Sequence, residues 1–361
     1  MSVNVTKNPQ AWKGYAIHDN KKYTDFKVID FEPKTAGDYD VDIAIQYCGV
    51  CASDHHTISG GWGETVLPLI TGHEITGIAT KVGPKVTSIK VGDRVGAGAQ
   101  ICACFECKPC KTDNENYCAN LVDTYNAKYP NGDIAHGGYS TGIRAHERFV
   151  FPIPDGVDLA DAAPMLCGGL TTFSPLIRNG AGTTAKKVGI VGIGGLGHFA
   201  VMWAKALGCE VYAFSHSPSK KEDALKLGAD HFVDTSNKSF AEPLAGEIDL
   251  IVSTASNVSH LPLAEYLSTL SVHGKLVYVG MPEDSLPPIK SQQLAGNGCF
   301  IGSSHIGNKK EAIQMLQLAA DKGVKTWKSV IPMKDADKAI RAIEENTIRF
   351  RTVLKQDLVE Y

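Results

Sequence analysis

The sequence predicts an α/β protein in which a β-rich, barrel-like domain is joined to a doubly wound domain built on a parallel sheet. Short β-type segments punctuated by Gly, Pro and Asp fill the first half of the chain. From about Lys186, strand and helix patterns alternate, which is typical of a parallel sheet. The chain has 361 residues, 43% hydrophobic and 21% charged, which is long enough for separate cores and too apolar for disorder.

The β-rich part is expected to contain strands at 40–47, 77–82 and 92–95. The first of these alternates, with one set of side chains expected to face inward: Val41, Ile43 and Ile45. Glycine, proline and aspartate separate the segments, as expected of antiparallel strands joined by turns.

The doubly wound part follows. Its expected strands are 188–191, 210–214, 231–233, 249–253, 275–279 and 299–302, and its first helices are 196–207 and 220–227. The tail is expected to form helices at 311–320 and 336–343 and a closing strand at 350–354, with Gly323 ending the first helix. We expect this tail to return to the first domain. The predicted domains are therefore 1–160 with 306–361, and 161–305.

Charge and hydropathy exclude two classes of partner. The formal net charge is −3, so the sequence offers no basic footprint for nucleic acid or an anionic membrane surface. No apolar run reaches the roughly 18 residues that a membrane span needs. Neither a secretory leader at the start nor a retention or peroxisomal signal at the end is recognisable. We expect a cytoplasmic protein that acts on a small molecule.

A glycine-rich turn follows the expected strand at 188–191 and precedes a helix. Its glycines permit a tight turn and the close approach of a pyrophosphate, and the helix N-terminus supplies N–H groups. A strand-helix turn without a ligand shares this pattern, but the surrounding alternation of strands and helices favours a dinucleotide. The predicted cofactor residues are Gly192, Gly194, Gly195, Leu196 and Gly197.

The end of the second expected strand indicates which dinucleotide binds. An NAD site usually carries Asp or Glu about 20 residues after the glycine turn, but here no acid precedes Glu222. Serine and lysine can instead hold a 2′-phosphate through charge-assisted hydrogen bonds. A solvated helix start would explain the lysines but not the missing acid. The loop predicts NADP(H), with these residues around the phosphate: Ser215, His216, Lys220 and Lys221.

Four cysteines form a compact C-x2-C-x2-C-x7-C loop: Cys104, Cys107, Cys110 and Cys118. Four thiolates at this spacing can enclose a tetrahedral zinc ion, and an iron–sulfur cluster is the alternative. Cys102 is surplus to a four-coordinate site, so it is either a small buried residue or a competing ligand. The loop predicts a structural zinc site.

Other candidate ligands are dispersed along the chain. Cys51 lies in a Cys-Gly-Val-Cys-Ala-Ser-Asp-His-His segment, His73 lies before Glu74, and Cys167 lies in a Pro-Met-Leu-Cys-Gly-Gly segment. Taken singly, a buried cysteine or a satisfied core histidine is the commoner explanation for each. Spacing alone does not assemble them into a site.

Through these motifs the sequence resembles the zinc-dependent medium-chain alcohol dehydrogenases. It is most similar to the cinnamyl alcohol dehydrogenase branch and its fungal NADP-dependent, broad-specificity members. The resemblance covers nearly the whole chain, including the segments 48–54, 72–74, 104–118, 164–169, 192–197, 300–303 and 349–351. It implies a GroES-like catalytic domain, a Rossmann domain that binds NADP(H), two zinc ions per chain and a homodimer.

The same resemblance implies a catalytic zinc held by three residues: Cys51, His73 and Cys167. Glu74 would lie beside the metal, and the fourth position would stay open for water or substrate. Asp54 would accept a hydrogen bond from the far nitrogen of His73 and fix its tautomer. Ser53 would bind the substrate oxygen and pass its proton through the cofactor ribose to His56.

The implied reaction is hydride exchange between NADPH and an aldehyde, with zinc as a Lewis acid. Trp62, Phe300 and Ile301 would line an apolar substrate pocket, although Phe300 and Ile301 fit ordinary strand core equally well. His216 stands where many NADP-dependent relatives carry Arg. Asp123 stands where plant members place a large aromatic residue, which favours a broad range of aromatic and aliphatic aldehydes.

Three other functions remain as alternatives. A zinc-free quinone or enone reductase would share the fold but would need neither set of metal ligands. A polyol dehydrogenase would keep the zinc and would need polar partners for several hydroxyls. A catalytically inactive binding protein would be expected to have lost a ligand, and no ligand is missing from either set.

Overall fold

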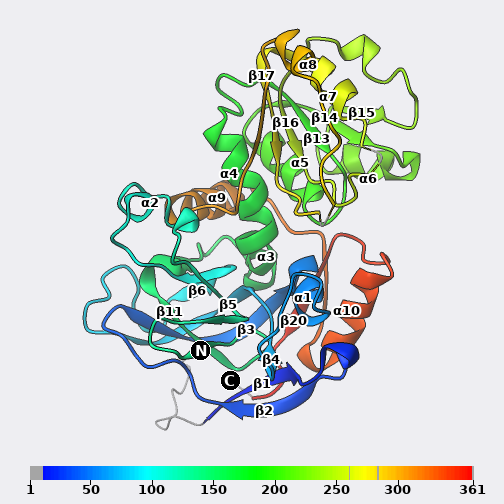
Figure 1. Cartoon of the computed structure of the whole chain (residues 1–361). Coiled ribbons are helices and arrows are strands. Elements are labelled where there is room, and N and C mark those ends of the chain that lie inside the picture. The colour runs from blue at the N-terminus through cyan, green and yellow to red at the C-terminus, as the bar shows by residue number, and fades with distance from the viewer. Residues whose placement is uncertain (1–10, 260, 283, 360–361) are drawn as a thin grey trace. The chain divides into compact units, whose positions relative to one another are not determined.

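The structure is a computed structural model that describes residues 11–259, 261–282 and 284–359 (Figure 1). The chain divides into two compact units, Met1–Cys167 with Asn308–Tyr361 as unit 1 and Gly168–Gly307 as unit 2. The domain limits expected from the sequence, 160/161 and 305/306, stay a prediction. No helix in the described part of the chain is long and apolar enough to cross a membrane.

Unit 1 is built mainly of strands. These are β1 (Trp12–Ile17), β2 (Lys27–Phe31), β3 (Asp40–Val50), β4 (Leu69–Ile70), β5 (Glu74–Val82), β6 (Arg94–Ala97), β7 (Gln100–Cys102), β8 (Val122–Asp123), β9 (Ala127–Lys128), β10 (Ile134–Ala135), β11 (Gly142–His146), β12 (Val150–Pro152), β19 (Lys328–Pro332) and β20 (Arg351–Lys355). Its helices are α1 (Ala52–Ile58), α2 (Lys108–Lys111), α3 (Leu159–Pro164), α9 (Lys309–Lys322) and α10 (Ala336–Glu344), and residues 165–169 form a π-helical turn.

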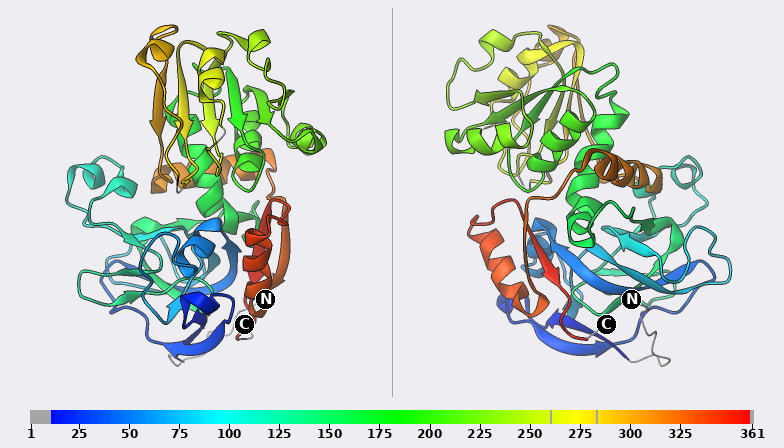
Figure 2. Two further views of the ribbon diagram at one scale, coloured as in Figure 1. Left: turned by 45° about the vertical axis from the view of Figure 1, so that its right-hand side comes forward. Right: turned by 180° about the vertical axis from the view of Figure 1, so that it is seen from behind.

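The main sheet of unit 1 runs in the order β12-β6-β5-β3-β20-β19, and β11 also pairs with β3. Val41, Ile43 and Ile45 face inward as predicted and are buried in the core of this unit, but Asp40 and Asp42 beside them are buried as well. Asp42, between Val41 and Ile43, accepts hydrogen bonds from Arg144 Nε at 2.6 Å and Nη2 at 2.8 Å. The C-terminal β20 pairs antiparallel with β3, so the tail joins the sheet of unit 1 (Figure 2).

Unit 2 is a six-stranded parallel sheet in the order β15-β14-β13-β16-β17-β18. Its strands are β13 (Lys187–Val191), β14 (Glu210–Ser215), β15 (His231–Asp234), β16 (Ile248–Ser253), β17 (Leu270–Tyr278) and β18 (Phe300–Ser303). Its helices are α4 (Leu170–Arg178), α5 (Gly197–Ala206), α6 (Lys221–Lys226), α7 (Leu263–Thr269) and α8 (Ser291–Ala295). The strand order reverses at β13, as in doubly wound sheets, so the predicted fold class is confirmed.

Several element ends differ from the predicted ends for local reasons. The strand expected at 92–95 begins at Arg94, because Gly92 turns with φ +95°. The closing strand begins at Arg351, because Phe350 adopts φ +72°. Gly323 ends α9 in the left-handed conformation, as predicted.

Candidate active site

Four buried residues of metal-ligand type meet in unit 1. Cys51 lies between β3 and α1, His73 precedes β5, Glu74 begins β5, and Cys167 lies in the π-helical turn. One donor atom from each lies within 4.8 Å of the donor atoms of the others. The structure therefore brings together residues that their spacing in the sequence does not connect.

The donor set of this cluster fits a zinc ion. His73 Nε2 lies 3.2 Å from Cys167 Sγ, so the imidazole presents this nitrogen to the cluster. Glu74 Oε1 accepts a hydrogen bond from Arg351 Nη2, whereas Glu74 Oε2 is buried without a partner in the described structure. A bound cation would satisfy that oxygen. Two sulfurs, an imidazole and a carboxylate are all ligands that zinc accepts.

The pKa values describe how protons are distributed in this cluster. The hydrogen bond from Cys167 lowers the pKa of Cys51 well below its usual value, and the same contact raises the pKa of Cys167. Burial opposes a charge on His73, but the hydrogen bond with Cys51 and the charge of Asp54 raise its pKa to about 9. Burial raises the pKa of Glu74 to about 7, although the charge of Arg351 opposes this. A metal must therefore displace protons to bind here.

Asp54 is fully buried and accepts three hydrogen bonds. They come from the backbone N–H groups of Cys51, at 2.9 Å, and Gly72, at 3.0 Å, and from the hydroxyl of Tyr139, at 3.1 Å. These bonds hold the start of α1 against the turn before β5. The carboxylate also lies 3.9 Å from His73 Nδ1, which is an ion-pair distance but longer than the direct hydrogen bond that the resemblance implied.

Tyr125 lies closer to His73 Nδ1 than Asp54 does. Its hydroxyl lies 3.1 Å from His73 Nδ1, and the two rings stack with centroids 5.4 Å apart and planes at 17°. Burial, together with the charge of Asp54, raises the pKa of Tyr125 well above 10, so the hydroxyl keeps its proton. Sequence reasoning missed this residue, because Tyr125 is 52 residues from His73 and belongs to no spacing motif.

Of the expected proton relay, Ser53 contacts the cluster and His56 lies one turn further along α1. Ser53 and His56 are three residues apart on α1, so they share a face of the helix. Ser53 Oγ lies 3.5 Å from Cys51 Sγ. His56 stacks on Trp62 with centroids 4.9 Å apart and planes at 9°, and Trp62 is 46% exposed. The relay itself stays a prediction.

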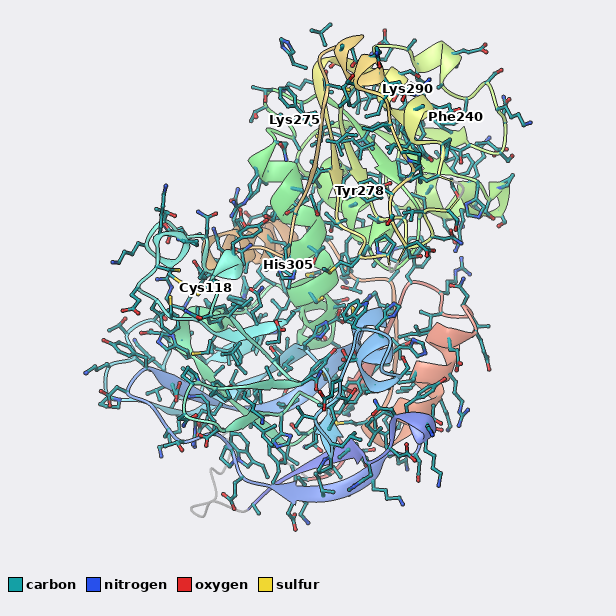
Figure 3. The ribbon with its side chains drawn as sticks, in the orientation of Figure 1. Cys118, Phe240, Lys275, Tyr278, Lys290 and His305 are labelled. Atoms are coloured by element: carbon teal, nitrogen blue, oxygen red, sulfur yellow. The ribbon has the colours of Figure 1, made fainter. Side chains whose placement is uncertain are left out.

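The four cysteines of the loop at 104–118 form the second cluster. Cys118 Sγ lies 3.4 Å from Cys104 Sγ and 3.8 Å from Cys107 Sγ, and Cys104 Sγ lies 4.0 Å from Cys110 Sγ. Sulfurs bound tetrahedrally at about 2.3 Å from a zinc ion stand about 3.8 Å apart. The cluster therefore fits zinc. Figure 3 labels Cys118, which lies close to α2.

The surroundings of this loop fix its position in unit 1. Arg148 Nη2 donates to the carbonyl of Cys110 at 3.2 Å and to Glu115 at 3.0 Å. Phe105, at φ +61°, stacks on His146 with centroids 4.0 Å apart. Burial lowers the pKa of His146 to about 4, so its ring is neutral near pH 7.

Cys102 lies outside the cluster. Its sulfur faces the carbonyl of Ala103 at 3.7 Å, and it does not belong to either group of metal-ligand side chains in the described structure. Burial raises the pKa of Cys102, which keeps the thiol protonated. This geometry agrees with Cys102 as a small, partly buried residue rather than as a competing metal ligand.

The glycine turn between β13 and α5 has a shape that lets a ligand approach the backbone closely. Gly192 has φ +85°, and a Cβ at Gly197 would lie 1.8 Å from the carbonyl oxygen of Gly192. A Cβ at Gly194 would meet no atom within 4 Å, so the packing of the chain does not itself require glycine there. That glycine is the one that lets a pyrophosphate approach the backbone. The turn therefore fits a dinucleotide, with Gly195 and Leu196 completing it before α5.

The loop after β14 contains the residues expected at the 2′-phosphate. Ser215 ends the strand and accepts a hydrogen bond from Ser217 N at 3.1 Å. His216 and Lys221 are exposed, and Lys220 is partly buried. In the parallel register Ser215 is opposite Asp234, whose carboxylate accepts hydrogen bonds from the Ser236 N–H and hydroxyl at 2.9 and 2.7 Å. One oxygen of the Asp234 carboxylate is therefore occupied by hydrogen bonds within the turn that follows β15.

The expected substrate pocket stays a prediction, and its residues belong to both units. Phe300 and Ile301 lie on β18, at the edge of the parallel sheet. Phe300 is 59% exposed, so it is not ordinary strand core in this chain. Ile301 packs partly against the core of unit 2. Trp62 belongs to unit 1.

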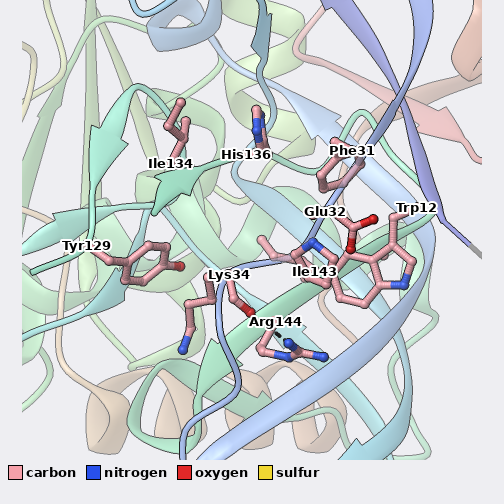
Figure 4. A pocket seen from close by; sticks show the side chains of 11 residues that line it. Trp12, Phe31, Glu32, Lys34, Tyr129, Ile134, His136, Ile143 and Arg144 are labelled. Atoms are coloured by element: carbon pink, nitrogen blue, oxygen red, sulfur yellow. Dashed lines mark hydrogen bonds between the residues drawn. The ribbon is translucent and has the colours of Figure 1, made fainter. Parts of the chain in front are cut away.

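A small cavity in unit 1 is not a substrate site. It is lined by aromatic and charged side chains, among them Trp12, Tyr129, His136 and Arg144 (Figure 4). Its volume is about 20 Å³, which is room for a single water. None of its lining residues belongs to either cluster of candidate metal ligands.

Known proteins resemble this chain in sequence. The family model for the alcohol dehydrogenase GroES-like domain matches residues 37–155, and the model for zinc-binding dehydrogenases matches residues 195–321. NADP-dependent alcohol dehydrogenase 6 of Saccharomyces cerevisiae is 41% identical over 354 residues, which cover 96% of this chain and 97% of that protein. A mannitol dehydrogenase of Petroselinum crispum is 41% identical over 325 residues, which cover 90% of this chain and 96% of that protein.

Solved structures show the same fold. A cinnamyl alcohol dehydrogenase from Sorghum bicolor has a TM-score of 0.90 at 34% identity, over 98% of this chain and all of that one. CAD from Helicobacter pylori, solved with NADP(H), has a TM-score of 0.85 at 35% identity, over 95% and 97% of the two chains. The chain therefore belongs to the family of zinc-binding alcohol dehydrogenases, oxidoreductases of alcohols and aldehydes built from a GroES-like and a Rossmann-type domain.

Proposed function

We propose that this protein is an NADPH-dependent zinc alcohol dehydrogenase that reduces a broad range of aromatic and aliphatic aldehydes. The observation that carries the proposal is the buried cluster of Cys51, His73, Glu74 and Cys167, with its unsatisfied carboxylate oxygen. The presence of both cysteine-rich clusters argues against a zinc-free quinone or enone reductase, which would need neither.

In this proposal Cys51, His73 and Cys167 hold a catalytic zinc, and the four cysteines of the loop at 104–118 hold a structural one. When bound, zinc supplies a Lewis acid to the substrate oxygen and the nicotinamide supplies the hydride. Glu74, paired with Arg351, stays beside the metal ligands. Burial of all four residues of the catalytic cluster excludes bulk water from the charge that develops there.

The proton is handled by α1. Ser53 Oγ, 3.5 Å from Cys51 Sγ, donates a hydrogen bond to the substrate oxygen and gives up its proton as the alcohol forms. His56, on the same face of the helix, would restore that proton from solvent. Trp62, stacked on His56, offers an apolar and partly exposed surface for the substrate.

NADPH is the proposed cofactor. The glycine turn would receive the pyrophosphate, and the residues that would hold the 2′-phosphate are Ser215, His216, Lys220 and Lys221. NADP-dependence in the yeast relative and NADP(H) in the Helicobacter pylori structure support this choice.

We also propose a cytoplasmic homodimer. The ten cysteines are all free thiols in the structure, which suits a reducing compartment. Cytoplasmic location and dimerisation both remain expectations taken from sequence and family.

A polyol dehydrogenase is the second candidate, because mannitol dehydrogenases are among the relatives at 41% identity. The apolar surface of Trp62 favours aldehydes without many hydroxyls, since each buried and unpaired hydroxyl would weaken binding.

The two candidates are separated by steady-state kinetics. We would measure kcat/KM for cinnamaldehyde, benzaldehyde and hexanal with NADPH, and for mannitol and sorbitol with NADP⁺, using zinc-loaded protein and Cys167→Ala as the blank. The proposal requires turnover of the aldehydes, faster oxidation of benzyl and cinnamyl alcohol than of the polyols, and loss of activity in the variant. Faster oxidation of mannitol would select the polyol function. No turnover of any substrate would select a binding protein.

A further inference from the structure

His73 needs a hydrogen-bond acceptor at Nδ1. Its Nε2 faces Cys167 Sγ at 3.2 Å, so Nε2 is the nitrogen available to a metal. A neutral histidine that binds metal through Nε2 carries its proton on Nδ1, and the partner of that N–H fixes the tautomer and the ring orientation. Asp54, at 3.9 Å, is too distant to be that partner, whereas the hydroxyl of Tyr125 lies at 3.1 Å.

We propose that Tyr125 is the positioning residue of His73. Its hydroxyl oxygen accepts a hydrogen bond from His73 Nδ1–H, and its hydroxyl hydrogen is donated to the carboxylate of Asp54. The inference rests on the proposed function, because it requires His73 to bind a metal. It assigns to Tyr125 the role that sequence resemblance gave to Asp54.

The directions of the hydrogen bonds are consistent along this chain of groups. An ionised carboxylate only accepts, so in this arrangement the hydroxyl of Tyr125 donates to Asp54 as a fourth bond, beside those from Cys51, Gly72 and Tyr139. The oxygen of Tyr125, which has two lone pairs, can then accept from His73 Nδ1–H as well as from Thr57. The two rings lie nearly parallel, at 17° with centroids 5.4 Å apart, and the hydroxyl lies 3.1 Å from His73 Nδ1. Asp54, Tyr125 and His73 thus form a continuous chain of hydrogen bonds that ends at the proposed metal ligand His73.

The residues next to Tyr125 hold it in this position. Thr124 Oγ1 donates to the carbonyl of Gly98 at 2.6 Å. Asn126, at φ +53°, accepts a hydrogen bond from Val66 N at 2.8 Å through its side chain. Each neighbour of Tyr125 is therefore tied to a different segment of unit 1. Tyr125 itself is 7% exposed, so its ring has little freedom to move away from His73.

The test is the zinc affinity of the catalytic cluster. Tyr125→Phe keeps the ring and removes the acceptor, and Tyr129→Phe removes a buried hydroxyl nearby in the chain that does not contact His73. We would titrate both variants and the wild type with a metal chelator while counting zinc per chain. We would also record the visible absorption spectrum of cobalt placed at the catalytic cluster. Loss of an outer hydrogen bond to a metal-bound histidine typically costs about 10–100-fold in affinity.

We expect Tyr125→Phe to lose zinc from the catalytic cluster at a chelator concentration at least about tenfold lower than the wild type needs. The cobalt spectrum should shift, and the zinc of the four-cysteine loop should stay bound. Tyr129→Phe should match the wild type. Tyr125→Gln, whose amide oxygen can accept the same bond, should bind zinc more tightly than Tyr125→Phe.

Three results would overturn the inference: wild-type affinity and spectrum in Tyr125→Phe, equal losses in the Tyr125 and Tyr129 variants, or no difference between Gln and Phe at position 125. A wild type that binds no zinc at the catalytic cluster would instead defeat the proposed function as well. Zinc counting on the wild type therefore separates the failure of one from the failure of the other.

Discussion

Ser53 and His56 provide the most local test of the proposed chemistry. General acid–base groups contribute about 10²–10⁴-fold to a rate, and His56 acts one step further from the substrate than Ser53. His56→Gln should therefore lower kcat for aldehyde reduction moderately, and Ser53→Ala should lower it more. Stopped-flow measurement of NADPH oxidation gives both values. Full activity in Ser53→Ala would show that the relay does not run through this hydroxyl.

Ser215 tests the choice of cofactor at the same scale. Ser215→Asp would add an acceptor for a ribose hydroxyl and a charge that repels a phosphate, so the NADH/NADPH ratio of kcat/KM should rise, mainly through poorer use of NADPH. Loss of a charge-assisted hydrogen bond is worth about 1.5–3 kcal/mol, or about ten- to a hundredfold in affinity. Equal use of both cofactors by the wild type would contradict the proposed role of the loop.

Individual residues also mark the limit of what the sequence could predict. The four-cysteine loop was recognisable because its ligands lie within a short local spacing. Cys51, His73 and Cys167 were connected only by resemblance, because their proximity depends on the pairing of distant strands. Tyr125 could not be found at all, since nothing in its own neighbourhood distinguishes a tyrosine that contacts a ligand from one that fills the core.

The four-cysteine loop is the element whose metal should matter most for stability. Because binding free energy at a structural site is also folding free energy, Cys107→Ser should lose one zinc and lower the melting temperature. Cys167→Ser should also lose one zinc and should abolish activity, but with a much smaller change in melting temperature. Calorimetry and metal analysis on the same samples compare the two. Equal melting temperatures for the two variants would contradict the division into structural and catalytic sites.

The packing of this loop also predicts how stability depends on pH. Burial of His146, mainly through desolvation, lowers its pKa from 6.5 to about 4 in the folded chain. Between these values the unfolded chain takes up a proton that the folded chain does not. Stability contributed by the neutral ring is therefore full above about pH 6.5 and falls as the pH drops toward 4.

His146→Phe keeps a ring against Phe105 and removes this titration. Urea unfolding measured between pH 7 and pH 4 should show a shallower loss of stability in the variant than in the wild type. Parallel curves for the two proteins would show that His146 does not contribute to the acid sensitivity.

Most helices and strands could be located from sequence periodicity, because buried positions repeat along each one. Their ends depend on single residues in unusual conformations. Phe350 adopts φ +72°, which a bulky residue rarely does and which no sequence pattern indicates. The π-helical turn that presents Cys167 was likewise unpredictable, since its sequence continues the preceding α3 without a breaking signal other than Pro164.

At the scale of the whole molecule, the parallel sheet was the easier half to predict. Alternating strands and helices allow few topologies, and the observed order of unit 2 is one of them. The sheet of unit 1 depends on long-range pairing, above all of β20 with β3, whose residues are about 300 positions apart. Local patterns contain no information about that register.

The central claim for the whole molecule is that one chain builds two distinct zinc sites, one of them catalytic. The most direct measurement is the zinc content of freshly purified protein that has never been exposed to chelators, determined by mass spectrometry of the metal against the protein concentration. The account predicts two zinc ions per chain, one lost in Cys107→Ser and the other in Cys167→Ser. A content of one zinc or none in the wild type would contradict it.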